Sequence, residues 1–266
     1  MPRPIITFLS DFGRDDWFVG VVHGVLHQIC PDARVVDLTH EIPAGHIARA
    51  AFVLEAAAPD FPPDTVHLAV VDPGVGTDRR GLAVRSRGQS FVGPDNGLLE
   101  WAVADPGAET HVLTEARYFR PPVSRTFHGR DVFGPVAAHL ARGESIAKLG
   151  LRVRDPVRLE RPVLRRADGA VVGSVMFVDR YGNALTNLTE QDLADSFPMV
   201  PETRLVVGVA GREVRGLARS YGDAPLGTLV ALLGSSGRLE IAQVGGNASD
   251  RLGLSEGDAV AVRAGS

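Results

Sequence analysis

The residues with the clearest chemical potential lie in the segment 69–80, which reads AVVDPGVGTDRR. An apolar run ends there at Asp72, and the chain turns through one proline and two glycines before it reaches Arg79. A buried strand that ends in a glycine-rich polar loop is a usual ligand site in open α/β sheets. The loop has neither the Gly-Lys-Ser/Thr ending of a P-loop nor the G-x-G-x-x-G spacing of a dinucleotide-binding loop. We therefore expect it to present a carboxylate and a guanidinium to a ligand rather than to cradle a phosphate.

Two more acids occupy comparable positions. Asp11 and Asp37, like Asp72, stand where a β-rich run ends, and patterns typical of helices separate the three runs. Alternating strands and helices predict a βαβαβ unit with parallel strands and right-handed crossovers. Because the carboxyl ends of parallel strands meet at one edge of a sheet, we expect the three acids to lie along that edge.

The first half of the chain is predicted to be an α/β domain with a mainly parallel sheet. The predicted strands are 5–9, 34–38, 65–71, 81–86, 89–92 and 111–113, and the predicted helices are 17–29, 47–57, 98–103 and 132–142. Asp15 or Asp16 would cap the first of these helices, and Asp131 would cap the last. His128 would lie in the loop just before the last helix, and PDNG at 94–97 is predicted to be a turn.

The second half has a different texture. From residue 151 to 169, arginines, prolines and acids occur without helical periodicity, which is typical of a linker. Short β-rich runs separated by Gly, Asp and Asn follow, and they predict a small all-β, barrel-like domain. The runs are 173–178, 204–209, 212–215, 228–233, 241–244 and 259–263. We expect an α/β domain over 1–155, a linker over 156–169 and a β-barrel domain over 170–266.

The composition excludes several classes of protein. With 266 residues, 44% of them hydrophobic and 23% charged, the chain resembles an ordinary soluble globular protein. Its net charge of −4 provides no broad basic face for nucleic acid. No apolar run reaches the roughly 18 residues of a membrane span, and the beginning of the sequence lacks a signal-peptide layout. The single Cys30 excludes an internal disulfide. We expect a cytoplasmic protein.

Five motifs along the chain together match one family. They are TFLSDFG at 7–13, VVDPGVGT at 70–77, FHGRD at 127–131, YGNALTN at 181–187 and GSSGRLEIA at 234–242. In these motifs the chain resembles the S-adenosyl-L-methionine (SAM) hydroxide adenosyltransferases, which are adenosine-forming SAM hydrolases related to the fluorinase and chlorinase enzymes. The resemblance implies an N-terminal α/β domain, a C-terminal β-barrel and a homotrimer whose active sites lie between neighbouring subunits.

The resemblance also implies a catalytic triad. Asp72, Arg79 and His128 match the Asp–Arg–His triad of the hydrolase branch, which the halogenases lack. Only ten residues separate Arg80 from Phe91, which leaves no room for the insertion that halogenases carry in this domain. Both features favour water over halide as the nucleophile. The implied reaction is attack of water on the ribose C5′ carbon of SAM, with the R-sulfonium epimer as one candidate substrate, to form adenosine and methionine.

Such a hydrolysis needs an activated water in line with the carbon–sulfur bond, and a pocket for a cationic substrate. Methionine leaves as a neutral thioether, so no general acid is required. Arg79 near Asp72 would hold the carboxylate ionised and oriented. The same guanidinium would disfavour protonation of His128 and leave a neutral imidazole. We expect Asp72 and His128 to share the activation of water.

Substrate-binding residues follow from the same resemblance. Asp11 matches the acid that accepts the ribose hydroxyls, and Asn183 matches the residue that contacts adenine. The other implied contacts are Tyr221 stacking on the base, Asp179 and Glu240 binding the methionine ammonium, and Ser235 and Ser236 binding its carboxylate. Because some relatives carry Arg at the position of Ser236, the carboxylate here would be bound by hydroxyls and backbone N–H groups.

Three alternatives to a SAM hydrolase stay open from the sequence. They are a SAM-dependent halogenase, a metal-dependent hydrolase and a non-catalytic nucleoside-binding protein. The ligands of the second alternative would be Asp11, Asp37, His40, Asp72 and His128. The intact triad argues against pure binding. We expect no metal, no cofactor, and no nucleic-acid or membrane partner; the expected partners are SAM, adenosine and methionine.

Overall fold

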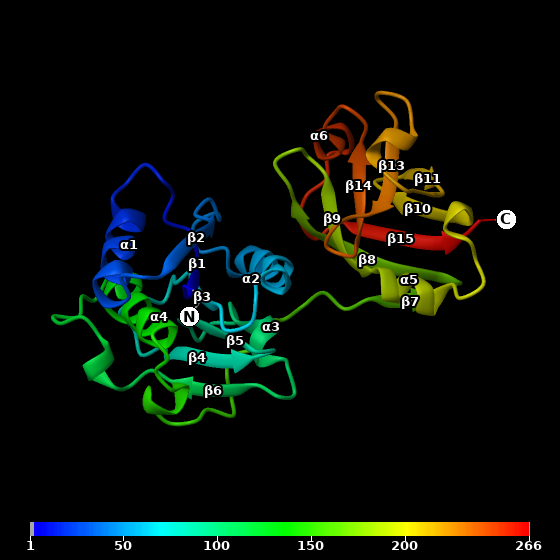
Figure 1. Ribbon diagram of the computed structural model, residues 1–266. Helices are drawn as coiled ribbons and strands as arrows, with labels where there is room; N and C mark the ends of the chain where they lie inside the picture. Colours follow the sequence, from blue (N-terminus) through cyan, green and yellow to red (C-terminus); the bar gives the residue numbers. More distant parts are fainter. Residues whose placement is uncertain (1–2, 266) are drawn as a thin grey trace. The chain divides into compact units, whose positions relative to one another are not determined.

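The computed structural model describes residues 3–265, and the chain divides into two compact units between Leu159 and Glu160 (Figure 1). The first unit holds a six-stranded sheet covered by helices, and the second holds a nine-stranded sheet. Within residues 3–265, no helix has the length and apolarity that a membrane crossing requires.

The sheet of the first unit is mixed, with most strands running in one direction. Its strands are β1 (Ile5–Ser10), β2 (Arg34–Thr39), β3 (Val66–Val70), β4 (Gly81–Ser86), β5 (Gln89–Pro94) and β6 (Glu109–Val112). In the order β2-β1-β3-β5-β4-β6 the first four strands are parallel, whereas β4 is antiparallel to both of its neighbours. The expected α/β architecture with a mainly parallel sheet is therefore confirmed.

Helices cover both faces of this sheet (Figure 1). They are α1 (Phe18–Ile29), α2 (Ile47–Ala57), α3 (Glu100–Val103) and α4 (Gly134–Ala141). Helix α1 packs against α4 over one face, and α2 packs against α3 over the other. Strands covered on both faces read as continuous apolar runs, and every residue of β3 is accordingly buried.

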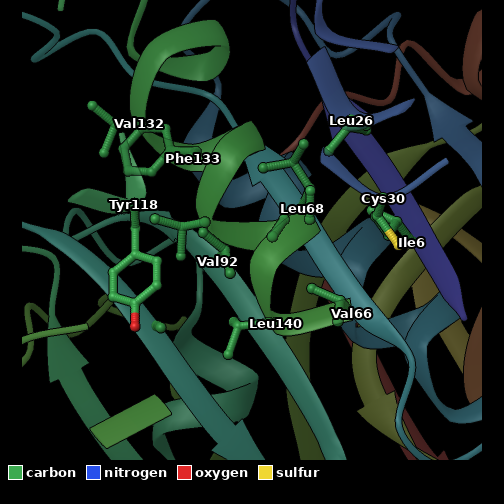
Figure 2. Packing of buried hydrophobic residues seen from close by; sticks show 14 of the residues in the cluster. Ile6, Leu26, Cys30, Val66, Leu68, Val92, Tyr118, Val132, Phe133 and Leu140 are labelled. Atoms are coloured by element: carbon green, nitrogen blue, oxygen red, sulfur yellow. The ribbon is translucent and has the colours of Figure 1, made fainter. Parts of the chain in front are cut away.

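The core under α1 and α4 shows the two-residue period of the strands. Val66 and Leu68 of β3 belong to this core, and Figure 2 shows them together with Leu26 of α1 and Leu140 of α4. The next residue along the strand, Ala69, belongs to the core on the opposite face. Each valine or leucine buried in this way contributes about 1.5–3 kcal/mol. The packing on both faces therefore fixes where β3 ends and where Asp72 begins its loop.

The predicted caps of the first helix are wrong. Helix α1 begins at Phe18 with Trp17 at the N-cap position, and no side chain caps the helix there. Trp17 already has helical dihedral angles, with φ −75° and ψ −8°. Asp15 and Asp16 therefore precede the N-cap position, and neither carboxylate serves as the cap.

The predicted cap of the last helix of this unit is wrong as well. Asp131 lies inside a π-helical turn, Gly129–Phe133, that leads into α4. Its side chain is fully buried and accepts hydrogen bonds from Arg130 Nε at 2.6 Å and from the Ser124 backbone N–H at 2.9 Å. The carboxylate therefore binds the neighbouring arginine and a backbone N–H of the preceding loop, and it does not cap the helix.

The second unit is a β-structure whose sheet nearly closes on itself. Its strands are β7 (Arg165–Ala167), β8 (Ala170–Val178), β9 (Ala184–Thr189), β10 (Leu205–Val209), β11 (Arg212–Arg215), β12 (Leu217–Ala218), β13 (Leu229–Leu233), β14 (Arg238–Gln243) and β15 (Ala259–Ala264). The order is β11-β10-β15-β8-β9-β14-β13-β12, with β7 paired to β8. Because β11 also contacts β13, the ends of the sheet approach each other, and the barrel-like character is confirmed.

Several elements of the second unit lie outside the predicted ones. They include the strands β7, β9 and β12 and two short helices, α5 (Glu190–Ser196) and α6 (Ala248–Leu252). In β9, Ala184, Thr186 and Leu188 are buried and alternate with half-buried residues. The alternation is not visible in the sequence, because the central buried residue is a polar threonine. Thr186 is accommodated in the core because its Oγ1 donates a hydrogen bond to the Leu239 carbonyl at 2.9 Å.

His67 is a neutral histidine in the central strand β3. Its ring stacks on Phe91 with centroids 4.7 Å apart, and its Nδ1 lies 2.8 Å from Thr7 Oγ1. The residue has no accessible surface, and burial lowers the pKa of His67 to about 4. Acid should therefore destabilise the sheet at its centre.

The free energy of unfolding is expected to fall by about 3 kcal/mol through His67 as the pH decreases from 6.5 to 4. In that window the unfolded chain binds a proton at His67 and the folded chain does not. His67→Gln should remove this part of the pH dependence. Urea unfolding of both proteins at a series of pH values measures the difference, and equal pH dependence in the two would contradict the prediction.

Candidate active site

The candidate site is a cleft of about 400 Å³ in the first unit, at the edge of the sheet where β1 and β3 end. Clefts of this size accommodate small molecules. Asp11, Asp72 and His128 line it, so the structure brings together three residues that were expected at the site. Its apolar lining includes Phe12, Val70, Pro73, Val75 and Phe127.

Asp72 and Arg79 form a two-point ion pair within the cleft loop. Arg79 Nε lies 2.8 Å from Asp72 Oδ1 and 3.0 Å from Oδ2, and Arg79 Nη2 also donates to Oδ2. The two side chains are 6% and 13% exposed, respectively, so solvent screens the pair little. The loop between them requires Gly76, where φ is +79° and a Cβ atom would lie 2.3 Å from the Arg125 carbonyl oxygen. A fork-to-carboxylate pair of this kind fixes both distance and orientation.

His128 is the second acceptor of the Arg79 guanidinium. Arg79 Nη2 lies 2.7 Å from His128 Nδ1. Because a guanidinium only donates hydrogen bonds, Nδ1 must be the acceptor, and the neutral ring carries its proton on Nε2. Burial and the positive charge of Arg79 lower the pKa of His128, whereas Asp72 and Asp131 oppose that shift. The ring is therefore neutral at pH 7, with its Nδ1 lone pair already engaged.

Phe133 completes the surroundings of the guanidinium. The Arg79 Cζ atom lies 5.0 Å from the centre of the Phe133 ring, within the range of a cation–π contact. The same ring meets the His128 ring edge to face at 6.4 Å. Sequence analysis missed this residue, because an apolar side chain inside a helical segment carries no signal of a functional contact.

Asp11 lies at the end of β1 and faces the same cleft. Its Oδ2 accepts a hydrogen bond from the Gly45 backbone N–H at 2.8 Å. Gly45 has a φ of +71°, a conformation that favours glycine. The Gly45 backbone N–H thus holds the Asp11 carboxylate in a fixed orientation at the cleft.

The five ligands of the metal-dependent alternative do not assemble into one group. Within residues 3–265, one group has ligand atoms close enough to hold a metal ion: His23, Asp37 and His40. Asp37 Oδ1 lies 2.8 Å from His23 Nε2 and 3.1 Å from His40 Nε2. Asp72 and His128 are outside this group and are bound to Arg79 instead. The triad is thus organised around a guanidinium.

A second group of expected residues lies in the other unit. Asp179 and Asn183 occupy the turn between β8 and β9. The Asn183 backbone N–H donates to Asp179 Oδ1 at 2.9 Å, and Asn183 Nδ2 donates to Oδ2 at 3.2 Å. The turn therefore holds an amide and a carboxylate in a fixed mutual arrangement.

Tyr221 and Glu240 belong to the same group. The Tyr221 hydroxyl donates to Glu240 Oε1 at 2.6 Å, while the tyrosine residue as a whole is 45% exposed. Glu240 is 5% exposed, and burial, together with the nearby charge of Asp179, raises its pKa. The carboxylate thus anchors the tyrosine, a contact that sequence analysis did not predict. Ser235 and Ser236 lie in the turn between β13 and β14.

Two family models match the sequence of this chain. The model of the SAM hydroxide adenosyltransferase N-terminal domain matches residues 6–150. The model of the SAM hydroxide adenosyltransferase C-terminal domain matches residues 173–261.

Individual proteins resemble the chain over nearly its whole length. It is 41% identical to an (R)-S-adenosyl-L-methionine hydrolase from Salinispora tropica, with 99% of each chain covered. It is 30% identical to a fluorinase from Nocardia brasiliensis, with 99% of this chain and 98% of the relative covered. Among solved structures, an uncharacterised conserved protein from Thermotoga maritima matches with a TM-score of 0.91 at 36% identity, with 97% of this chain and 99% of that chain covered.

Proposed function

The chain belongs to the SAM hydroxide adenosyltransferase family, and on this basis we propose that it hydrolyses (R)-S-adenosyl-L-methionine to adenosine and L-methionine. The observation that carries the proposal is that Asp72 and His128 line one cleft and are both hydrogen-bonded to Arg79. The greater similarity to a hydrolase than to a fluorinase points in the same direction.

The reaction forms a bond between a water oxygen and the ribose C5′ carbon and breaks the bond between C5′ and sulfur. The electron pair of the broken bond stays on sulfur, so methionine leaves as a neutral thioether. One proton of the water has to be removed. Holding the water in line with the carbon–sulfur bond contributes up to about 7–11 kcal/mol, and a positioned base contributes roughly 10²–10⁴-fold.

The hydrogen bonds of the triad give Asp72 and His128 different roles in the activation of water. A shared activation of water was expected, but His128 Nδ1 accepts from Arg79 and Nε2 carries the proton. The ring then has no free lone pair for a proton of water. The Asp72 carboxylate keeps acceptor capacity beyond its bonds to Arg79, so we assign it the proton of the attacking water. His128 holds the guanidinium, and through it the carboxylate.

The substrate contacts follow the site residues. Asp11 lines the cleft, and its carboxylate would accept hydrogen bonds from the ribose hydroxyls. In the second unit, the adenine contacts are Asn183 and Tyr221, and the methionine contacts are Asp179, Ser235, Ser236 and Glu240. A homotrimer, in which the second unit of one subunit completes the cleft of another, is part of the proposal and rests on the family resemblance. Sedimentation would show it as a particle of three chains.

Incubation of the purified protein with (R)-SAM tests the function. The expected products are adenosine and methionine in equal amounts, with or without added chloride or fluoride. A 5′-halo-5′-deoxyadenosine would identify a halogenase, and binding without turnover would identify a nucleoside-binding protein. Loss of turnover on chelation, with recovery on addition of a metal ion, would identify a metal-dependent hydrolase. Parallel reactions with (S)-SAM measure the preference between epimers.

A further inference from the structure

The turn after β5 lies against the loop that carries the triad. Residues 72–80 lie between β3 and β4 and, on the proposed function, form the catalytic loop. Because β3 and β5 are parallel neighbours, the turn at 94–97 leaves the sheet at the same edge as this loop. We propose that Asp95 and Asn96, two consecutive residues of this turn, are positioning residues that hold the two ends of the catalytic loop.

Asn96 holds the end that carries Asp72. Its Nδ2 donates to the Val71 backbone carbonyl at 2.9 Å, and its Oδ1 accepts from the Leu98 backbone N–H at 3.1 Å. The second bond fixes which end of the amide faces Val71. Since Val71 directly precedes Asp72, the Asn96 side chain sets the backbone position from which the catalytic carboxylate extends.

Asp95 holds the end that carries Arg79. The Asp95 backbone N–H donates to the Arg80 carbonyl at 2.9 Å, and Asp95 Oδ2 accepts from Arg80 Nε at 2.7 Å. The Asp95 side chain is only 2% exposed, so this contact between opposite charges is little screened. Since Arg80 directly follows Arg79, the ion pair anchors the backbone from which the triad guanidinium extends.

The last residues of the first unit complete the arrangement. Arg80 Nη1 donates to Asp155 Oδ1 at 3.0 Å, and Arg80 Nη2 donates to the Asp155 carbonyl at 2.7 Å. Asp95 Oδ1 accepts from the Val157 backbone N–H at 2.7 Å. Both oxygens of the Asp95 carboxylate therefore have partners, and the carboxylate is held from two sides.

These anchors have a defined consequence for catalysis. The residues that they hold, Val71 and Arg80, are the direct neighbours of Asp72 and Arg79 in the chain. A shift of either one therefore moves a catalytic group. A misplacement of about 1 Å costs roughly 10²-fold in rate. Neither Asp95 nor Asn96 lines the cleft, so substrate binding does not depend on them directly. Loosening an anchor should therefore lower kcat and leave KM nearly unchanged.

A double-mutant cycle tests this role. Asn96→Ala should lower kcat by about 10–100-fold, with KM changed less than about threefold. In the Asp72→Asn background it should cause no further loss beyond about threefold, because Asn96 acts through Asp72. An equal loss in both backgrounds, measured in single turnovers at high enzyme concentration, would overturn the proposal.

Amide hydrogen exchange supplies a readout that does not depend on activity. Asn96→Ala and Asp95→Asn should each speed exchange in residues 72–80 and leave the other strands of the sheet protected. Unchanged exchange there would refute the anchoring, whereas faster exchange in a protein without SAM hydrolysis would refute the proposed function alone. The matched control is Asp64→Asn, which breaks an ion pair of 2.6 Å with Arg85 elsewhere on β4. It should leave both kcat and exchange in residues 72–80 unchanged.

Discussion

Asp72→Asn is expected to lower kcat for SAM hydrolysis by roughly 10²–10⁴-fold. An amide keeps the shape of the side chain and one acceptor for Arg79, but it cannot take a proton from water. The loss should appear in kcat, because the ribose and adenine contacts assigned to Asp11 and Asn183 are unchanged. Steady-state and single-turnover measurements with (R)-SAM give the two constants.

The control for this substitution removes a carboxylate that is also paired with an arginine but does not line the cleft. Asp64→Asn satisfies this condition, because Asp64 pairs with Arg85 and its side chain is 81% exposed. It should keep the kcat of the unaltered protein. If Asp72→Asn hydrolysed SAM within about tenfold of the unaltered rate, Asp72 would not be the general base.

His128→Ala and His128→Asn are expected to differ strongly from each other. Alanine leaves the Arg79 guanidinium without its second acceptor, and a hydrogen bond to a charged group is worth about 1.5–3 kcal/mol. This loss corresponds to roughly 10–150-fold in kcat. Asparagine places an amide oxygen near the position of Nδ1 and should retain activity within about fivefold. If both variants lost activity equally, His128 would have to act on the proton itself.

The pH dependence of kcat gives a second test of the same assignment. As the pH falls, His128 gains a proton at Nδ1, and this proton then opposes the Arg79 donor. Burial and Arg79 lower the pKa of His128, with Asp72 and Asp131 opposing them, so kcat should fall at acidic pH with a midpoint below 6.5. His128→Asn should lack this decline. The control His27→Asn replaces an exposed histidine at the end of α1 and should reproduce the unaltered profile.

Local sequence patterns predicted the helices and strands well where the apolar periodicity and the turn-forming residues at the ends of an element agreed. The helix expected at 47–57 is α2, and the strand expected at 212–215 is β11, each with the same bounds. The predictions failed where a polar side chain has partners other than those that the local rule assumes. The Asp131 carboxylate accepts hydrogen bonds from Arg130 and Ser124 and does not cap a helix. In β9, the buried Thr186 interrupts the apolar alternation.

The two-part architecture, the positions of Asp11 and Asp72 after parallel strands, and the motifs that assign the family could be predicted from the sequence, whereas Asp37, expected at a strand end, lies inside β2. These properties depend on short-range spacing or on residue identity, which a sequence displays directly. It also placed Asp72 and Arg79 seven residues apart on a glycine-containing turn, which was enough to expect a pair.

The role of the guanidinium follows from contacts between residues that are far apart in the sequence. Arg79 and His128 are 49 residues apart in sequence, and it is the distance of 2.7 Å between Nη2 and Nδ1 that fixes the tautomer of the ring. Likewise, Asn96 and Val71, whose carbonyl it holds, are 25 residues apart in sequence. Whether two groups form a hydrogen bond depends on tenths of an ångström between atoms that packing brings together. The spacing of residues along the sequence does not predict such contacts. The different roles of Asp72 and His128 in the triad therefore follow from the folded chain alone.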